Sequence, residues 1–155
     1  MAYPNLDEDL VNELLDDGRA SLRSLAENLD VSVTTISNHL EQLSSDNKIN
    51  GFAPVVNYDA WGYDTTCVIN ISVEGSTLTE FTNRLNDHPN MVSIYEVTGD
   101  FDVVAIGKFE DTDHMNSEIK TLLSDDSVED TNTTVVLNTV RDNEQFDLPT
   151  TEENE

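Results

Sequence analysis

The segment that most constrains the fold is residues 21–52, SLRSLAENLDVSVTTISNHLEQLSSDNKINGF. Two runs of apolar residues with helical spacing are separated here by only two residues, Asp30 and Val31. Each run follows a serine, Ser21 or Ser32, whose hydroxyl can accept from the orphan N–H groups of a first helical turn. The apolar runs consist of Leu22, Leu25, Ala26 and Leu29, and then of Val33, Ile36, Leu40 and Leu43. The pattern predicts two helices joined by a tight turn, because aspartate tolerates the left-handed conformation of such a corner.

The face opposite the second apolar run is polar, and this polarity bears on whether the helix pair can bind DNA. Small hydroxyl and amide side chains at the start of an exposed helix suit hydrogen bonds to base edges and phosphates. This is the layout of a helix-turn-helix, whose second helix enters the major groove. A helix pair with polar outer faces is also a common scaffold, so this segment alone leaves DNA binding and a purely structural role open. The candidate DNA contacts are Arg19, Arg23, Ser32, Thr34, Thr35, Ser37, Asn38, His39 and Lys48.

The charge of the chain opposes ordinary DNA binding. Its 155 residues include 32 acidic and 7 basic side chains, for a formal net charge of −25, the wrong sign for a phosphate backbone. Low hydrophobicity with high net charge is typical of disorder, but the apolar periodicity persists along the chain. Acids spread over every segment with few lysines fit a protein that works in multimolar salt, where repulsion is screened within a few ångström. We therefore expect a halophilic cytoplasm.

Several classes of site are not favoured by the sequence. Cys67 is the single cysteine and lies in an apolar alternating run, so a buried structural thiol is expected. His39, His88 and His114 have no metal-ligand spacing, and no phosphate-binding glycine loop or nucleophile motif is present. No run of residues reaches transmembrane length. We expect a soluble, cytoplasmic protein without a metal, a cofactor or catalytic activity.

The rest of the N-terminal half completes a small domain. Residues 6–17 predict a first helix, with acids in its first turn and Gly18 as its stop. Residues 47–56 are expected to be extended and to form a small wing or strand. We place the helix-turn-helix domain at 1–52 and a linker at 53–64, where Trp61 and Tyr63 pack either at a domain or subunit contact or in the local core.

The second half alternates strand and helix patterns. Strands are predicted at 65–74, 91–97, 102–110 and 128–140, and helices at 77–87 and from 111 or 112 to 124. This order is the split βαβ, ferredoxin-like βαββαβ arrangement, so the fold class is α+β. Helices on one face leave the other face of the sheet open, and Val103, Ala105, Val135 and Leu137 indicate that parts of both faces are apolar. We expect dimerisation through this domain, residues 65–142, and a disordered acidic tail at 143–155.

Taken together, the chain resembles the leucine-responsive/asparagine regulator (Lrp/AsnC) family from residue 6 to about 140. The phrases that carry the resemblance are LDEDLVNELLDDGRASLRSLAENLDVS, HLEQLSSDNKINGF, WGYD, VTGDFDVVAIG and TNTTVVL, in this order. The resemblance implies a transcription regulator that binds double-stranded DNA as a homodimer or a larger ring, a tetramer or octamer. It also implies an effector domain that senses an amino acid where dimers meet.

The resemblance assigns the effector site to the loop Thr98–Gly99–Asp100–Phe101–Asp102, which matches the family's Gly-Asp-x-Asp loop. A glycine lets the backbone approach a small ligand, and a carboxylate can pair with an α-ammonium group. From the residues alone, a plain hairpin turn is the favoured interpretation of Gly99-Asp100, and the resemblance reverses this preference. Thr131 and Thr133 on the last strand are expected to add hydroxyls.

The chain departs from the family pattern at three positions. His39 stands where the family usually has arginine, and Asp30 and Asn47 stand at usual glycine positions. The loss of an arginine predicts that uncharged side chains and bridging cations hold DNA, so that added KCl does not weaken binding. Two other functions remain open: a stand-alone amino-acid sensor acting on a protein partner, and a weakly specific architectural DNA-binding protein.

Overall fold

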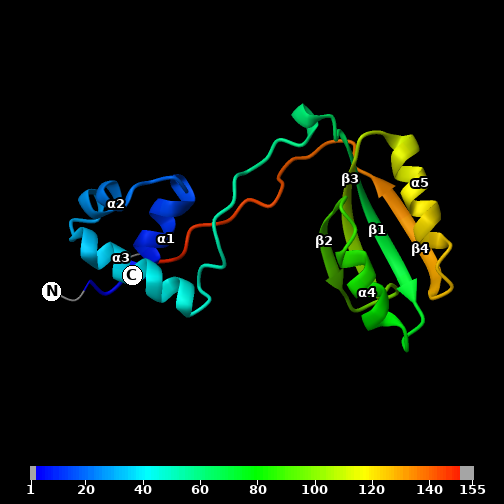
Figure 1. Cartoon of the computed structure of the whole chain (residues 1–155), viewed down its shortest axis with the longest axis horizontal. Coiled ribbons are helices and arrows are strands. Elements are labelled where there is room, and N and C mark those ends of the chain that lie inside the picture. Colours follow the sequence, from blue (N-terminus) through cyan, green and yellow to red (C-terminus); the bar gives the residue numbers. More distant parts are fainter. Residues whose placement is uncertain (1–2, 151–155) are drawn as a thin grey trace. The chain divides into compact units, whose positions relative to one another are not determined.

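The computed structural model describes residues 3–150 as two compact units (Figure 1). The first unit combines the residues up to Pro54 with those from Arg141 onward, and the second spans Val55–Val140. The chain therefore leaves the first unit once and returns to it at its C-terminal end.

The first unit is a three-helix domain of α1 (Leu6–Asp16), α2 (Leu22–Asn28) and α3 (Val33–Ser45). The predicted serine caps are both confirmed: Ser21 accepts a hydrogen bond from the Ser24 backbone, and Ser32 accepts one from the Thr35 backbone. The buried side chains of the three helices form one core, consisting of Leu10, Leu25, Ala26, Ile36 and Leu43.

The expected apolar stripe of α3 is wrong at its first position. Val33 is 45% exposed, while Ile36 and Leu43 are buried and Leu40 packs against the core. Val33 is the first residue of the helix, one turn before the stripe meets its neighbours. Leu22, at the first position of α2, is 40% exposed. In both helices the first turn lies outside the core.

Two non-glycine residues adopt the left-handed backbone at the corners of this unit. Asp30 has φ 52° between α2 and α3, and Asn47 has φ 56° just after α3. Both are positions at which the resemblance expects glycine, and Asp and Asn are the side chains that tolerate this region best. The helix-turn-helix corner is therefore built without its usual glycines.

The segments around the helical core contain two differences from the expectations. Residues 47–56, all of which are described, form no strand, so the wing is an extended loop. The C-terminal tail also differs from the disorder expected of it, at least as far as residue 150. Leu148 exchanges two hydrogen bonds with the Asn12 side chain of α1, at 3.0 and 2.7 Å. Residues 151–155 lie outside the described part of the chain.

The second unit is the predicted ferredoxin-like βαββαβ fold. Its first element is a short 3₁₀ turn, η1 (Asp59–Trp61), in which Trp61 is 77% exposed and outside the core clusters. Its elements are β1 (Thr65–Val73), α4 (Leu78–Asn86), β2 (Met91–Glu96), β3 (Val103–Phe109), α5 (Thr112–Leu123) and β4 (Val128–Val135). The sheet order is β2-β3-β1-β4, and all neighbouring strands are antiparallel.

One face of the sheet packs against α4 and α5 (Figure 1). Alternate residues of β1 and β3 are buried on this face, together with Phe81 and Leu85 of α4 and Met115 of α5. Cys67 is completely buried there, as expected, and burial raises the pKa of its thiol.

The residues expected to make both faces of the sheet apolar lie elsewhere. Val103 and Ala105 are buried in the helix-covered core. The open face instead carries Val68, which pairs with Ile106, and Val104, which pairs with Tyr95. An apolar patch is therefore present on the open face, but other residues form it.

The last strand is shorter than the predicted 128–140. Val135 pairs with Cys67, and the backbone N–H of Val136 still donates to Thr66. Since β1 begins at Thr65, the residues after 136 have no neighbouring strand. Leu137 is 98% exposed for this reason.

Candidate nucleic-acid interface and effector loop

The exposed face of α3 carries three polar side chains that point away from the core. Thr34, Ser37 and Asn38 are exposed, one turn into a helix of 13 residues. Ser32 and Thr35 are used differently: the Ser32 hydroxyl caps the helix at 3.0 Å from the Thr35 backbone nitrogen and lies 2.8 Å from the Thr35 hydroxyl. Compared with Ser32 and Thr35, the side chains of Thr34, Ser37 and Asn38 are therefore the ones available to another molecule.

A carboxylate that the sequence interpretation missed connects two further candidates. Asp7 of α1 accepts a hydrogen bond from His39 Nδ1 at 2.7 Å and one from Lys48 Nζ at 3.2 Å. The hydrogen bond from His39 holds the pKa of Asp7 below its ordinary value, and Lys48 acts in the same direction while partial burial opposes both. The structure thus brings His39 and Lys48 together on one anion.

The two arginines proposed as DNA contacts lie on the surface of the same unit. Arg23 is 84% exposed and pairs with Glu27 one turn later at 3.0 Å. Arg19 is exposed, and its backbone N–H donates to the Asp17 side chain. Exposed pairs of this kind contribute little to stability and exchange readily, so both guanidinium groups can reach a phosphate.

The proposed effector loop between β2 and β3 contains two aspartates in different environments. Asp102 Oδ2 accepts from the Val73 backbone N–H at 2.9 Å, and the Asp102 backbone pairs with Ile71 and Val97. Asp102 therefore fixes the loop to the end of β1. The Asp100 carboxylate, by contrast, is exposed next to Gly99, which has φ 120°.

The other residues of the loop differ in their exposure and in their contacts with the sheet. Thr98 is exposed and Phe101 is half-buried. The Asp100 carbonyl accepts from the Ser72 hydroxyl at 3.2 Å. Only Asp100 and Thr98 in this loop therefore present polar side chains to solvent. The loop backbone is held by the hydrogen bonds that link Asp100 to Ser72 and Asp102 to Val73.

Thr131 and Thr133 are not brought to this loop within one chain. They pair with Ile71 and Ile69 of β1, so β1 lies between them and β3, a separation of two strand spacings or about 10 Å. Because directly opposed residues share a face, both threonines point to the helix-covered side of the sheet.

Metal binding is not indicated by the structure. Within residues 3–150, no group of three His, Cys, Asp or Glu side chains is arranged to hold a metal ion. His88 and His114 do approach the same carboxylate, Glu118, at 2.8 and 3.8 Å. His114 and Glu118 are one turn apart on α5, but the sequence did not signal the contact with His88, which follows α4 and lies 30 residues from Glu118. None of the helices described is long and apolar enough to cross a membrane.

Comparison with protein families matches both units. Residues 5–50 match the winged helix-turn-helix DNA-binding model, and residues 66–146 match the Lrp/AsnC ligand binding domain. A transcriptional regulator of the helix-turn-helix type from Pyrococcus horikoshii, itself uncharacterized, is 37% identical over 142 residues, covering 92% of this chain and 96% of the relative.

Two solved structures share the fold over nearly the whole chain. A transcriptional regulator from Neisseria meningitidis in complex with L-methionine has a TM-score of 0.87 at 20% identity, covering 98% of this chain and 99% of the other. The feast or famine regulatory protein from M. tuberculosis, complexed with L-methionine, has a TM-score of 0.86 at 25% identity, covering 95% and 100%.

Proposed function

Because the chain belongs to the Lrp/AsnC family of transcriptional regulators, which are not enzymes, we propose how its own residues read DNA and sense an effector. The proposal is a regulator that binds specific DNA through α3 and changes its DNA affinity or assembly when an amino acid binds near the loop 98–102.

DNA recognition is assigned to the start of α3. The single observation that carries this is the exposed trio Thr34, Ser37 and Asn38, set on a capped helix opposite its buried stripe. Side-chain amides and hydroxyls at this position of a second helix suit base edges in the major groove. Arg19, Arg23, His39 and Lys48 then supply phosphate contacts, with Ser32 and Thr35 shaping the helix start.

Salt is part of the proposed mechanism. With a net charge of −25, approach to DNA is repulsive in dilute buffer. We propose that the protein works in a halophilic cytoplasm, where K⁺ screens this repulsion and bridges surface carboxylates to phosphates. Binding should therefore be unchanged or strengthened by added KCl, whereas counterion release predicts a steep loss.

Effector sensing is assigned to Asp100, supported by Thr98 and by Gly99, whose φ is 120°. An exposed carboxylate on a fixed loop can pair with an α-ammonium group, and two structural neighbours are complexes with L-methionine. Thr131 and Thr133 can contribute only if another copy of the chain, or a shift of the sheet, brings them to the ligand.

Self-association is assigned to the open face of the sheet. Val68, Val104, Ile106 and Tyr95 form an apolar patch there, and Tyr95 is 54% exposed. Burying such a patch against a second copy is favourable at roughly 25 cal/mol per Å². We propose a homodimer through this face that assembles further into a tetramer or octamer.

The first experiment is fluorescence anisotropy of labelled DNA from upstream of the chain's own gene, titrated with the full chain in multimolar KCl with and without a pool of amino acids. Specific binding that the pool alters supports the proposal. Effector binding without DNA binding would favour a sensor acting on a protein partner. DNA binding without an effector response would favour an architectural role.

Matched variants separate the two halves of the proposal. Asn38→Ala should weaken specific binding about tenfold, the loss of roughly 1.4 kcal/mol expected for one base contact, while Ser44→Ala in the last turn of the same helix should not. Asp100→Asn should abolish the amino-acid response, with Glu110→Gln as its exposed control. An unchanged affinity in Asn38→Ala would remove α3 from base recognition.

A further inference from the structure

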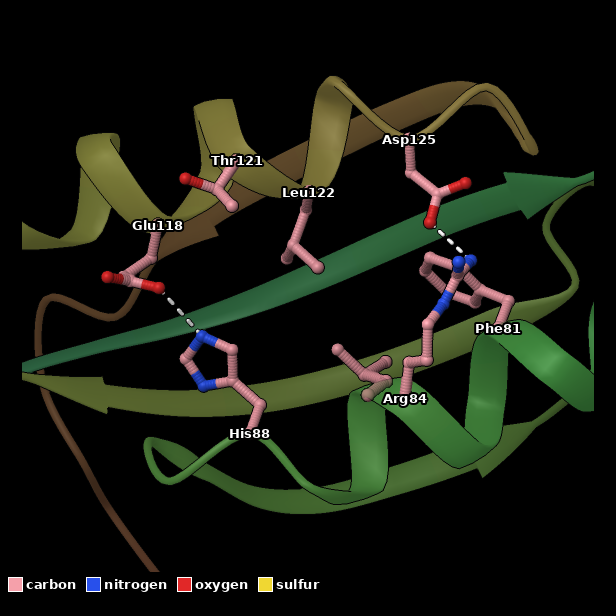
Figure 2. Close-up of a pocket in the computed structure, with 8 residues that line it drawn as sticks. Phe81, Arg84, His88, Glu118, Thr121, Leu122 and Asp125 are labelled. Carbon is pink, nitrogen blue, oxygen red and sulfur yellow. Dashed lines mark hydrogen bonds and ion pairs between the residues drawn. The ribbon is translucent and has the colours of Figure 1, made fainter.

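A groove between α4 and α5 lies apart from both assigned sites, and its cavity volume is about 180 Å³ (Figure 2). It lies between the two helices that cover the sheet. The groove is lined by residues of α4, α5 and the turns that follow them: Phe81, Arg84, Leu85, His88, Glu118, Thr121, Leu122 and Asp125.

The floor of the groove is apolar. Phe81 and Leu85 each retain 2% exposure and belong to the sheet-side core, and Leu122 packs against the same core from α5. Figure 2 shows Leu122 between the two ends of the groove. A ligand lying along the floor would therefore contact carbon atoms over its middle.

Each end of the groove is closed by a side-chain hydrogen bond that joins the α4 side to the α5 side (Figure 2). At one end His88 Nε2 lies 2.8 Å from Glu118 Oε2. At the other end Arg84 Nη2 pairs with Asp125. Glu118 lies on α5 and Asp125 lies two residues beyond its end, and their spacing of seven residues separates the two ends by roughly 10 Å along the direction of the helix.

The two ends of the groove differ in the charged group that remains available to a ligand. Glu118 Oε1 is 3.8 Å from His114 Nε2, and Arg84 Nη1 is 3.8 Å from Glu80; both distances are too long for hydrogen bonds. Asp125 is already engaged, because its Oδ1 accepts from the Ser127 backbone at 2.9 Å and its Oδ2 faces Arg84. Arg84 Nη2 also donates to the Ser127 hydroxyl at 3.5 Å, so the groups without a hydrogen-bond partner among the described residues are Glu118 Oε1 at one end and Arg84 Nη1 at the other.

We propose that this groove binds an ω-amino carboxylate, a molecule with a carboxylate and an ammonium group separated by several methylenes. The carboxylate would lie on Arg84, the ammonium on Glu118 and the methylenes on Phe81, Leu85 and Leu122. An α-amino acid with an uncharged side chain cannot bridge both ends, because its two charges share one carbon. A diamine would meet the guanidinium of Arg84 with a like charge.

The test is isothermal titration calorimetry of the full chain with 6-aminohexanoate, compared with hexanoate and norleucine. Binding of 6-aminohexanoate at least tenfold tighter than of either control is expected, since only this probe satisfies both ends. Equal affinity for hexanoate, equal affinity for norleucine, or no binding of 6-aminohexanoate would each overturn the proposal.

Variants place the ligand in the groove. Thr121 is exposed at the rim, so Thr121→Tyr should block binding by filling the groove, whereas Asn116→Tyr, exposed elsewhere on α5, should not. Glu118→Gln should weaken 6-aminohexanoate at least tenfold and leave hexanoate unchanged, which keeps the proposal testable if the tyrosine variant does not fold. Unchanged 6-aminohexanoate affinity in Glu118→Gln would refute the ammonium assignment.

The effector loop must be separated from the groove in the same experiment. Asp100→Asn should leave 6-aminohexanoate binding unchanged. If Asp100→Asn abolishes it, the probe occupies the loop, and the groove proposal is wrong while effector sensing stands. Groove binding measured without DNA is independent of whether α3 binds DNA at all.

Discussion

We predict that replacing Asp7 by asparagine changes the stability of the fold and the affinity for DNA in opposite directions. Its carboxylate is 30% exposed and binds His39 and Lys48 at 2.7 and 3.2 Å, the same two side chains that we assign to phosphates. Asp7→Asn removes the charge with almost no change in shape. A partly exposed pair of this kind contributes about 0.2–1 kcal/mol, so losing both should lower the free energy of unfolding by about 1 kcal/mol.

The same variant should bind DNA more tightly. Asp7 competes with phosphate for His39 and Lys48, and neutralising it releases both side chains. A partly exposed ion pair with a phosphate contributes about 0.2–1 kcal/mol, so each released side chain should raise the affinity by up to roughly fivefold. The measurements are urea unfolding and anisotropy at one fixed KCl concentration. Asp9→Asn is the matched control, because it removes the same charge from the same helical turn without a cation contact.

The pH dependence of this effect has a defined sign. The pKa of Asp7 is lowered in the folded state, so its stabilisation is complete above the pKa of the unfolded chain, about 3.9. It is lost as the pH falls through the lower folded value. The stability difference between the wild-type chain and Asp7→Asn should therefore disappear in acid. Weaker DNA binding by Asp7→Asn than by Asp9→Asn would refute the reasoning, since Asp7 would then position the cations for DNA.

Three further predictions concern the effector domain. Gly107→Ala should destabilise the fold by about 1–3 kcal/mol in urea unfolding, because a Cβ there would lie 2.6 Å from the Phe109 ring. Asp102→Ala should cost about 1–3 kcal/mol in the same assay, since the Val73 N–H loses its acceptor; an unchanged midpoint would show that water replaces it. Cys67, completely buried with a raised thiol pKa, should resist a thiol reagent at neutral pH until the chain is unfolded, and rapid reaction of the native protein would contradict its burial.

The sequence was sufficient for the elements whose evidence is local. Serine caps, helical spacing and strand alternation involve residues a few positions apart, and they predicted α2, α3 and the βαββαβ order. The errors lie where an element depends on a distant partner. The last strand ends near residue 136 because β1 begins at Thr65, and nothing within residues 128–140 encodes that limit.

The candidate sites follow the same division. The Gly99-Asp100 turn was predictable because its chemistry lies in consecutive residues. The roles of Asp102, which holds Val73, and of Asp7, which holds His39, were not, because each depends on a side chain meeting a group about 30 residues away.

An acidic chain makes such pairings especially hard to predict. With 32 carboxylates and 7 lysines and arginines, composition cannot identify which carboxylates meet a cation and which remain solvated. The few cations therefore carry most of the specific electrostatics, and Lys48 is shared between the fold, through Asp7, and the proposed DNA contact. His39 and Lys48 stabilise the helical unit through Asp7 and must leave it to reach DNA, so the affinity for DNA should be set as much by competition within the protein as by the contacts it makes.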